Sequence, residues 1–167
     1  GNVVFGGAEG NFDGNVGINV VPEIWHGDLS VVQLGGNGAW SSSTTAGATK
    51  LMTLSHNSYV ALADGLWKYQ NTDEVSAYRQ LSGTHVFRVA GSGTADTDIT
   101  WTDALTIDNS ANIGMAVTPE AFHADWTALQ VAGTGAIFGH TAQSAGSAIN
   151  LGQNVYYDGS YKYIVTD

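Results

Sequence analysis

The feature that most constrains the fold of this chain is a segment that occurs twice. Residues 15–26 and residues 112–123 are closely related and lie 97 positions apart. From residue 15 to residue 40, 11 of the 26 positions are identical to their counterparts, and the only two prolines, Pro22 and Pro119, occupy the same position of the repeat. A period this long indicates a duplicated module, because solenoid repeats are about 20 to 50 residues long.

The similarity continues and divides the chain. Residues 64–69 match residues 158–163 at an offset of 94, so the second copy has lost three residues. We therefore expect an N-terminal lead-in over residues 1–14, a first β-module over residues 15–111, and a second, shorter copy over residues 112–167. The two modules are expected to stack along one axis.

Both copies open with apolar residues that alternate with very small ones. Val16 and Ile18 flank Gly17, and the second copy keeps this period-two pattern, which predicts a strand. A strand with almost no side chain on one face indicates close approach by another backbone. We attribute that approach to neighbouring chains that wind around a common axis.

The rest of the chain also shows β-patterns. The Asp64-Gly65 pair predicts a hairpin turn, and residues 75–81 fit either a strand or a short helix. Asp103 falls on the apolar face of a predicted strand, where it marks a bulge or a face shared with water or a partner chain. The predicted strands cover residues 31–34, 84–90, 99–107 and 128–131.

The two prolines predict short helical turns. A threonine N-cap precedes Pro119, which fits the first helical position, so residues 119–125 are expected to form one or two turns. Residues 22–27 are expected to form a less well capped turn. Trp25 and Phe122 would then be buried anchors.

Composition narrows the class of protein and its partners. Charged residues make up 12% of the chain, against about 25% in an average globular protein, while apolar residues make up 43%. The net charge of −10 and the five cationic side chains disfavour nucleic acid and anionic membranes, since both need clustered cations. No apolar run is long enough to cross a membrane, so no membrane insertion is expected.

Three segments resemble sequence motifs that recur in bacteriophage tail fibres. Residues 105–115, LTIDNSANIGM, are similar to the fibre segment TLDASGNVGIG, and residues 92–96 and 158–163 are similar to other recurring fibre phrases. The resemblance implies an all-β, elongated, intertwined homotrimer, built of triple β-helix or β-prism-like modules with short helical turns. It also implies an extracellular location in the virion, within a tail fibre that continues to the baseplate and binds its receptor distally.

Composition supports a trimer independently. With 12% charge and no cysteine, stability must come largely from apolar surface shared between chains, at about 25 cal/mol per Å². An isolated chain is therefore expected to fold poorly, as obligate oligomers often do.

The sequence does not predict catalysis. A glycosidase needs two carboxylates about 5 to 9.5 Å apart, but most of the acids stand in turns, and Glu23 and Glu120 stand at the predicted helix starts. The Gly-x-Ser-x-Gly motif of a nucleophilic serine is absent. Residues 94–101 are similar to the sialidase Asp box, a non-catalytic turn, with Asp98 in place of its glycine. We therefore expect no enzyme and no cofactor.

The five histidines do not form a close pair of metal ligands, so no metal site is predicted. The remaining way to hold a metal would be three copies of His85 on a trimer axis. The alternative role for His85 is that of a hydrogen-bonded histidine at the interface between chains. His26 and His123 are interpreted as structural hydrogen-bonding residues near the predicted turns.

Sugar binding is the function that the sequence favours. Aromatic faces and short polar side chains grip sugars, and fibres contact receptors near their distal end, so residues 156–163 are the first choice. Packing between chains is the alternative for each aromatic residue. The receptor-contact candidates are Tyr156, Tyr157, Tyr161, Tyr163, Trp67 and Tyr69.

We therefore expect attachment to a bacterial surface receptor, a capsular or lipopolysaccharide glycan, without cleavage. Two alternatives stay open. One is a purely structural fibre shaft, and the other is a tailspike depolymerase.

Overall fold

The computed structural model describes residues 14–47, 50–142 and 146–164, and this part of the chain is β-structure without a helix. The strands are β1 (Val16–Ile18), β2 (Leu29–Leu34), β3 (Gly38–Ser43), β4 (Leu51–His56), β5 (Ser58–Val60), β6 (Trp67–Tyr69), β7 (Asp73–Leu81), β8 (Thr84–Gly93), β9 (Thr102–Ile107), β10 (Ile113–Met115), β11 (Trp126–Val131), β12 (Gly135–His140), β13 (Ile149–Gln153), β14 (Tyr156–Tyr157) and β15 (Tyr161–Lys162). The all-β prediction is confirmed. The lead-in predicted over residues 1–14 lies outside the described residues, except for Gly14.

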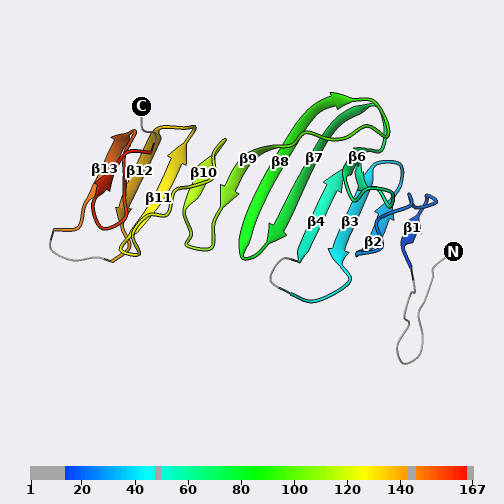
Figure 1. Cartoon of the computed structure of the whole chain (residues 1–167), viewed down its shortest axis with the longest axis horizontal. Coiled ribbons are helices and arrows are strands. Elements are labelled where there is room, and N and C mark those ends of the chain that lie inside the picture. The colour runs from blue at the N-terminus through cyan, green and yellow to red at the C-terminus, as the bar shows by residue number, and fades with distance from the viewer. Residues whose placement is uncertain (1–13, 48–49, 143–145, 165–167) are drawn as a thin grey trace.

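Eleven strands form one open, mixed sheet in the order β1-β2-β3-β4-β7-β8-β9-β10-β11-β12-β13. Two small sheets pair β5 with β6 and β14 with β15. Figure 1 shows the large sheet as one long row of strands, with β1 near one end of the molecule and β13 at the other. The described chain is therefore elongated across its strands, and the large sheet does not close into a barrel.

The two copies of the repeat have the same local geometry. β1 pairs in parallel with β2, and β10 pairs in parallel with β11. In each copy an asparagine accepts a hydrogen bond from the second strand: the Val31 N–H donates to Asn15 Oδ1 at 3.2 Å, and the Ala128 N–H donates to Asn112 Oδ1 at 3.0 Å. β7, β8 and β9 lie between the copies and continue the sheet from β4 to β10. The division into modules at residue 112 stays a prediction.

The small residues of β1 and β10 make room for the next segment of the same chain. A Cβ atom on Gly17 would lie 2.1 Å from the carbonyl oxygen of Val20 and 2.8 Å from Cδ of Pro22. A Cβ atom on Gly114 would lie 2.1 Å from the carbonyl oxygen of Val117. The close approach expected from the sequence is present, but its attribution to neighbouring chains is wrong at these glycines, because the approaching backbone is their own.

The helical turns predicted over residues 22–27 and 119–125 are wrong, because both segments are irregular. In each copy, the side chain of a buried glutamine accepts a hydrogen bond from a backbone N–H group that would otherwise lie in the first helical turn. Glu23 N–H donates to Gln33 Oε1 at 2.9 Å, and Gln130 accepts the equivalent bond at 3.0 Å in the second copy. Both glutamines are fully buried, so these bonds form inside the protein, where an unpaired amide is costly.

Each copy has its own aromatic core. Trp25 and Phe122 are 3% and 7% exposed, which confirms the prediction that they are buried anchors. The first cluster contains Trp25, Val31, Ala39 and Val60, with Leu29, Tyr59 and Trp67 packed against it. The second cluster contains Phe122, Ala128, Ala136 and Phe138, with Trp126, Val155, Tyr156 and Tyr157 packed against it.

A substitution at Phe138 tests how much the second cluster contributes to stability. The Phe138 ring is 1% exposed and lies 5.3 Å from the ring centroids of both Phe122 and Trp126. Phe138→Ala is expected to lower the free energy of unfolding by about 3 to 5 kcal/mol, because it leaves a cavity. Denaturant unfolding at a fixed protein concentration measures this. Leu62→Ala, at an exposed loop position, is the control and should change stability by less than about 0.5 kcal/mol.

The aromatic clusters lie on one face of the large sheet. In the first copy, Val60 and Trp67 of the small sheet pack against Val31 and Ala39 of the large one. In the second copy, Tyr156 and Tyr157 pack in the same way against Ala136 and its neighbours. We call this side the covered face.

The opposite side, here called the bare face, is apolar and exposed. Directly paired residues share a face of a sheet, and one row of such pairs runs from Leu54 through Tyr78, Phe87, Leu105 and Met115 to Val131. Exposed fractions of 41–85% are found for Ile18, Leu34, Trp40, Leu54, Phe87, Val89, Met115, Val131, Ile137, Ile149 and Leu151. A contiguous apolar surface of this kind marks an interaction site.

Candidate functional site

The predicted receptor-contact residues have different surroundings. Tyr69 is 6% exposed and its hydroxyl donates to the Gly91 carbonyl at 2.7 Å, while Trp67 packs against the first aromatic cluster. Tyr156 and Tyr157 are half-buried against the second cluster.

Tyr161 and Tyr163 are the exposed members of this set, at 63% and 73%. The ring of Tyr161 lies edge-on to Tyr157, with centroids 5.3 Å apart, so it extends the second aromatic cluster toward solvent. Receptor contact stays a prediction for all six candidates, and this pair is the most accessible to a ligand in the single chain.

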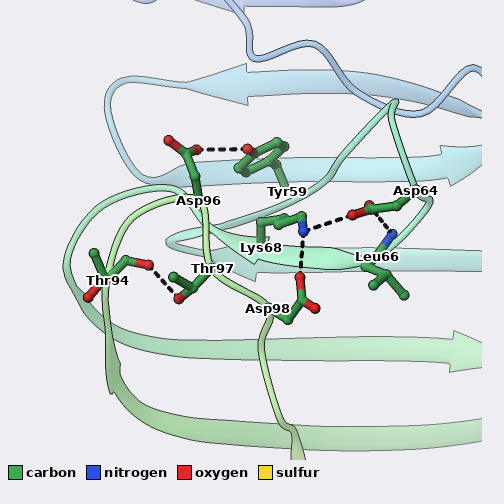
Figure 2. Close-up of polar contacts among 8 residues, drawn as sticks. All are labelled: Tyr59, Asp64, Leu66, Lys68, Thr94, Asp96, Thr97 and Asp98. Atoms are coloured by element: carbon green, nitrogen blue, oxygen red, sulfur yellow. Dashed lines mark hydrogen bonds and ion pairs between the residues drawn. The ribbon is translucent and has the colours of Figure 1, made fainter.

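A second polar and aromatic site lies where the segment after β8 returns across the β5–β6 hairpin (Figure 2). The Tyr59 hydroxyl donates to Asp96 Oδ1 at 2.8 Å. Lys68 Nζ lies 2.8 Å from Asp64 Oδ2 and 2.5 Å from Asp98 Oδ1. We call this group of five side chains the Tyr59 site. It ties β5 and β6 to a segment that is about 30 residues later in the chain.

The Asp-box-like segment forms a turn in this site. The Thr97 N–H donates to the Thr94 carbonyl at 3.1 Å, and the Thr97 hydroxyl donates to the same oxygen at 2.7 Å. Asp96 adopts a φ of 65°, a left-handed conformation that aspartate tolerates in turns. Asp98, which replaces the glycine of the Asp box, is held by Lys68.

The hydrogen bonds of the Tyr59 site favour a neutral Tyr59 and a charged Lys68–Asp64 pair. Burial, then the hydrogen bond to Asp96, raises the pKa of Tyr59 to about 12, so its hydroxyl stays a donor at neutral pH. The hydrogen bonds to Asp64 and Asp98 raise the pKa of Lys68, and the same bond from Lys68 lowers the pKa of Asp64. Lys68 is therefore a fixed cation rather than a nucleophilic amine.

A shallow groove of about 410 Å³ borders Tyr59. Burial, with a smaller contribution from Asp96, raises the pKa of Glu23 on its wall. Ile24 and Leu62 line the groove and are 72% and 54% exposed. Carboxylates that accept hydrogen bonds, next to aliphatic and aromatic surfaces, suit the hydroxyls and apolar faces of a sugar ring. Sequence reasoning missed this groove, because its parts come from distant segments.

The histidines have structural roles in the first and second copies. The Asp28 N–H donates to Nδ1 of His26, and the Asp125 N–H donates to Nδ1 of His123, both at 3.3 Å, which confirms the structural interpretation. His85 lies on the bare face, where Nδ1 contacts the Tyr78 hydroxyl. Among the described residues, no group of three or more potential ligands is arranged to hold a metal ion.

Comparison with known proteins gives no relative: no family model, no curated protein and no solved structure matches the chain. In the described ranges, no helix is long and apolar enough to span a membrane.

Proposed function

We propose that this chain is a segment of a bacteriophage tail fibre, which assembles as a homotrimer and attaches the virion to a bacterial surface glycan without cleaving it. The observation that carries the proposal is the bare face, an apolar surface that extends across the whole eleven-stranded sheet. The resemblance of residues 105–115 to a recurring tail-fibre sequence agrees with the proposal.

The bare face supports assembly for a physical reason. Burying apolar surface contributes about 25 cal/mol per Å², and the row from Leu54 to Val131 contains no Asp, Glu, Lys or Arg that would lose its hydration on burial. Three sheets with their bare faces turned toward one axis would form an elongated β-prism. The covered faces, with the Tyr59 site and the aromatic clusters, would then face outward.

The outward side of such a prism carries the groups that suit a glycan. Tyr161 and Tyr163 are exposed beside the second aromatic cluster, and the groove at Tyr59 combines the Glu23 carboxylate with apolar walls. The net charge of −10 keeps nucleic acid a poor partner.

The double substitution Tyr161→Ala and Tyr163→Ala is expected to weaken adsorption of the purified protein to host cells about tenfold, because two exposed aromatic contacts are lost. Fluorescent protein incubated with a panel of bacterial strains measures adsorption, and blocking of phage infection confirms it. The sedimenting mass should not change. Lys50→Gln, at an exposed position on neither the bare face row nor the aromatic clusters, is the control and should leave adsorption unchanged.

The same assay separates the alternatives. Binding to an isolated surface polysaccharide whose length stays unchanged supports the proposal. Absence of adsorption to every strain would indicate a purely structural shaft, and release of reducing sugar ends would indicate a depolymerase.

A further inference from the structure

Arg79 is a half-buried cation without an anionic partner. It lies on the covered face of β7, directly between Thr53 and Val86, and its Nε atom is buried without a hydrogen bond. Lys68, Arg88 and Lys162 each form an ion pair with an aspartate, whereas no described carboxylate lies within 4 Å of Arg79. The chain has 15 acidic residues and five cations, so an unpaired arginine in a half-buried position is unexpected.

The surroundings of Arg79 offset its positive charge only in part. Burial, then the charge of nearby Arg88, lowers the pKa of Arg79, and Asp103 opposes this only in part. Asp103 is already engaged, because its Oδ1 accepts bonds from Nε and Nη2 of Arg88 at 3.0 and 2.8 Å. Asp103 therefore pairs with Arg88 and leaves Arg79 without a bound carboxylate.

Further donors near the pair are unsatisfied. The Arg88 guanidinium lies 5.0 Å from the ring centroid of Trp101, whose indole N–H is buried without a partner. The hydroxyl of Thr53, opposite Arg79 on β4, is also unpaired, and this residue is 1% exposed. A guanidinium group can only donate hydrogen bonds, so any partner of the Arg79 guanidinium must be an acceptor.

We infer that Arg79, next to Arg88 on the covered face, forms a subsite for the carboxylate of an acidic sugar, such as a uronic acid, in the receptor glycan. The planar guanidinium matches a carboxylate with two parallel hydrogen bonds, which a lysine cannot reproduce. The partly exposed indole ring of Trp101, whose centroid lies 5.0 Å from the Arg88 guanidinium, provides a surface for the sugar ring near the two arginines. This subsite rests on the proposed function, since it specifies the class of glycan that the fibre recognises.

The test uses the assembled protein and an immobilised panel of uronic-acid oligosaccharides, each paired with its carboxyl-reduced counterpart. The unaltered protein should bind at least one acidic member about tenfold more tightly than its reduced form. Arg79→Gln should abolish this preference, and Arg79→Lys should retain only part of it. Lys50→Gln removes an exposed cation elsewhere and should leave the preference unchanged.

Each of the following results would overturn the inference. Equal binding of the acidic oligosaccharides and their reduced counterparts, or an unchanged preference for the acidic form in Arg79→Gln, would show that Arg79 does not bind a sugar carboxylate. A lower sedimenting mass of Arg79→Gln would instead assign Arg79 to a contact between chains. If the unaltered protein adsorbs to bacterial cells but to no acidic sugar, the subsite fails while the proposed function stands. If it adsorbs to no cells at all, both fail.

Discussion

Leu54→Asp is expected to dissociate the assembly, weakening association by at least about a hundredfold. Leu54 is 57% exposed in the single chain and lies on the bare face in the apolar row, between Trp40 on β3 and Tyr78 on β7. If three bare faces meet at an axis, the substitution places three carboxylates in one dry interface. Burying unpaired charge costs several kcal/mol per group, and a hundredfold effect needs only about 2.8 kcal/mol. Sedimentation over a range of protein concentrations measures the association.

Leu62→Asp is the matched control for this experiment. Leu62 is the same residue type and is 54% exposed, but it lies in the loop between β5 and β6, outside the bare face. This variant should assemble like the unaltered protein. If both aspartate variants behave alike, or if Leu54→Asp retains its assembled mass, the bare face is not an interface between copies.

Gly17→Ala is expected to destabilise the protein by about 3 kcal/mol. The added Cβ would lie 2.1 Å from the Val20 carbonyl oxygen and 2.8 Å from Cδ of Pro22, and neither is the end of a flexible side chain. The backbone around the proline must therefore move. This movement disturbs the segment that holds the Glu23 N–H group in its hydrogen bond to Gln33. Denaturant unfolding at constant protein concentration measures the change.

Gly36→Ala is the control for the glycine substitution, because a Cβ at Gly36 would meet no atom within 4 Å. Its effect should stay within about 0.5 kcal/mol. An equally small effect of Gly17→Ala would contradict the tight packing of the proline segment against β1. Gly114→Ala should reproduce the larger loss in the second copy, where the same contact recurs.

The sequence was most informative where a pattern is local. The alternation over residues 84–90 predicts β8, and the bulge considered for Asp103 is present as a register shift where Asp103 pairs with Arg88. Residues 75–81, which fit a strand or a helix, belong to β7, because Val75 and Ala77 face the buried side in alternation.

The errors arose where tertiary contacts override local propensity. The proline segments have acceptable helix-start residues. However, the side-chain oxygens of Gln33 and Gln130 accept the hydrogen bonds of the Glu23 and Glu120 N–H groups, from strands that lie ten residues later in the chain. The Tyr59–Asp96 bond joins residues 37 positions apart, and a single sequence has no local signal for such a contact. The absence of a partner for Arg79 likewise becomes visible only when the neighbouring strands are in place.

The mass of the unaltered protein in solution tests the central claim, that the bare face is covered by other copies of this chain. Sedimentation equilibrium at micromolar concentration should give a mass of three times 17.4 kDa for a cooperatively folded species. A well-folded species of 17.4 kDa that remains monomeric as its concentration is raised would contradict the claim.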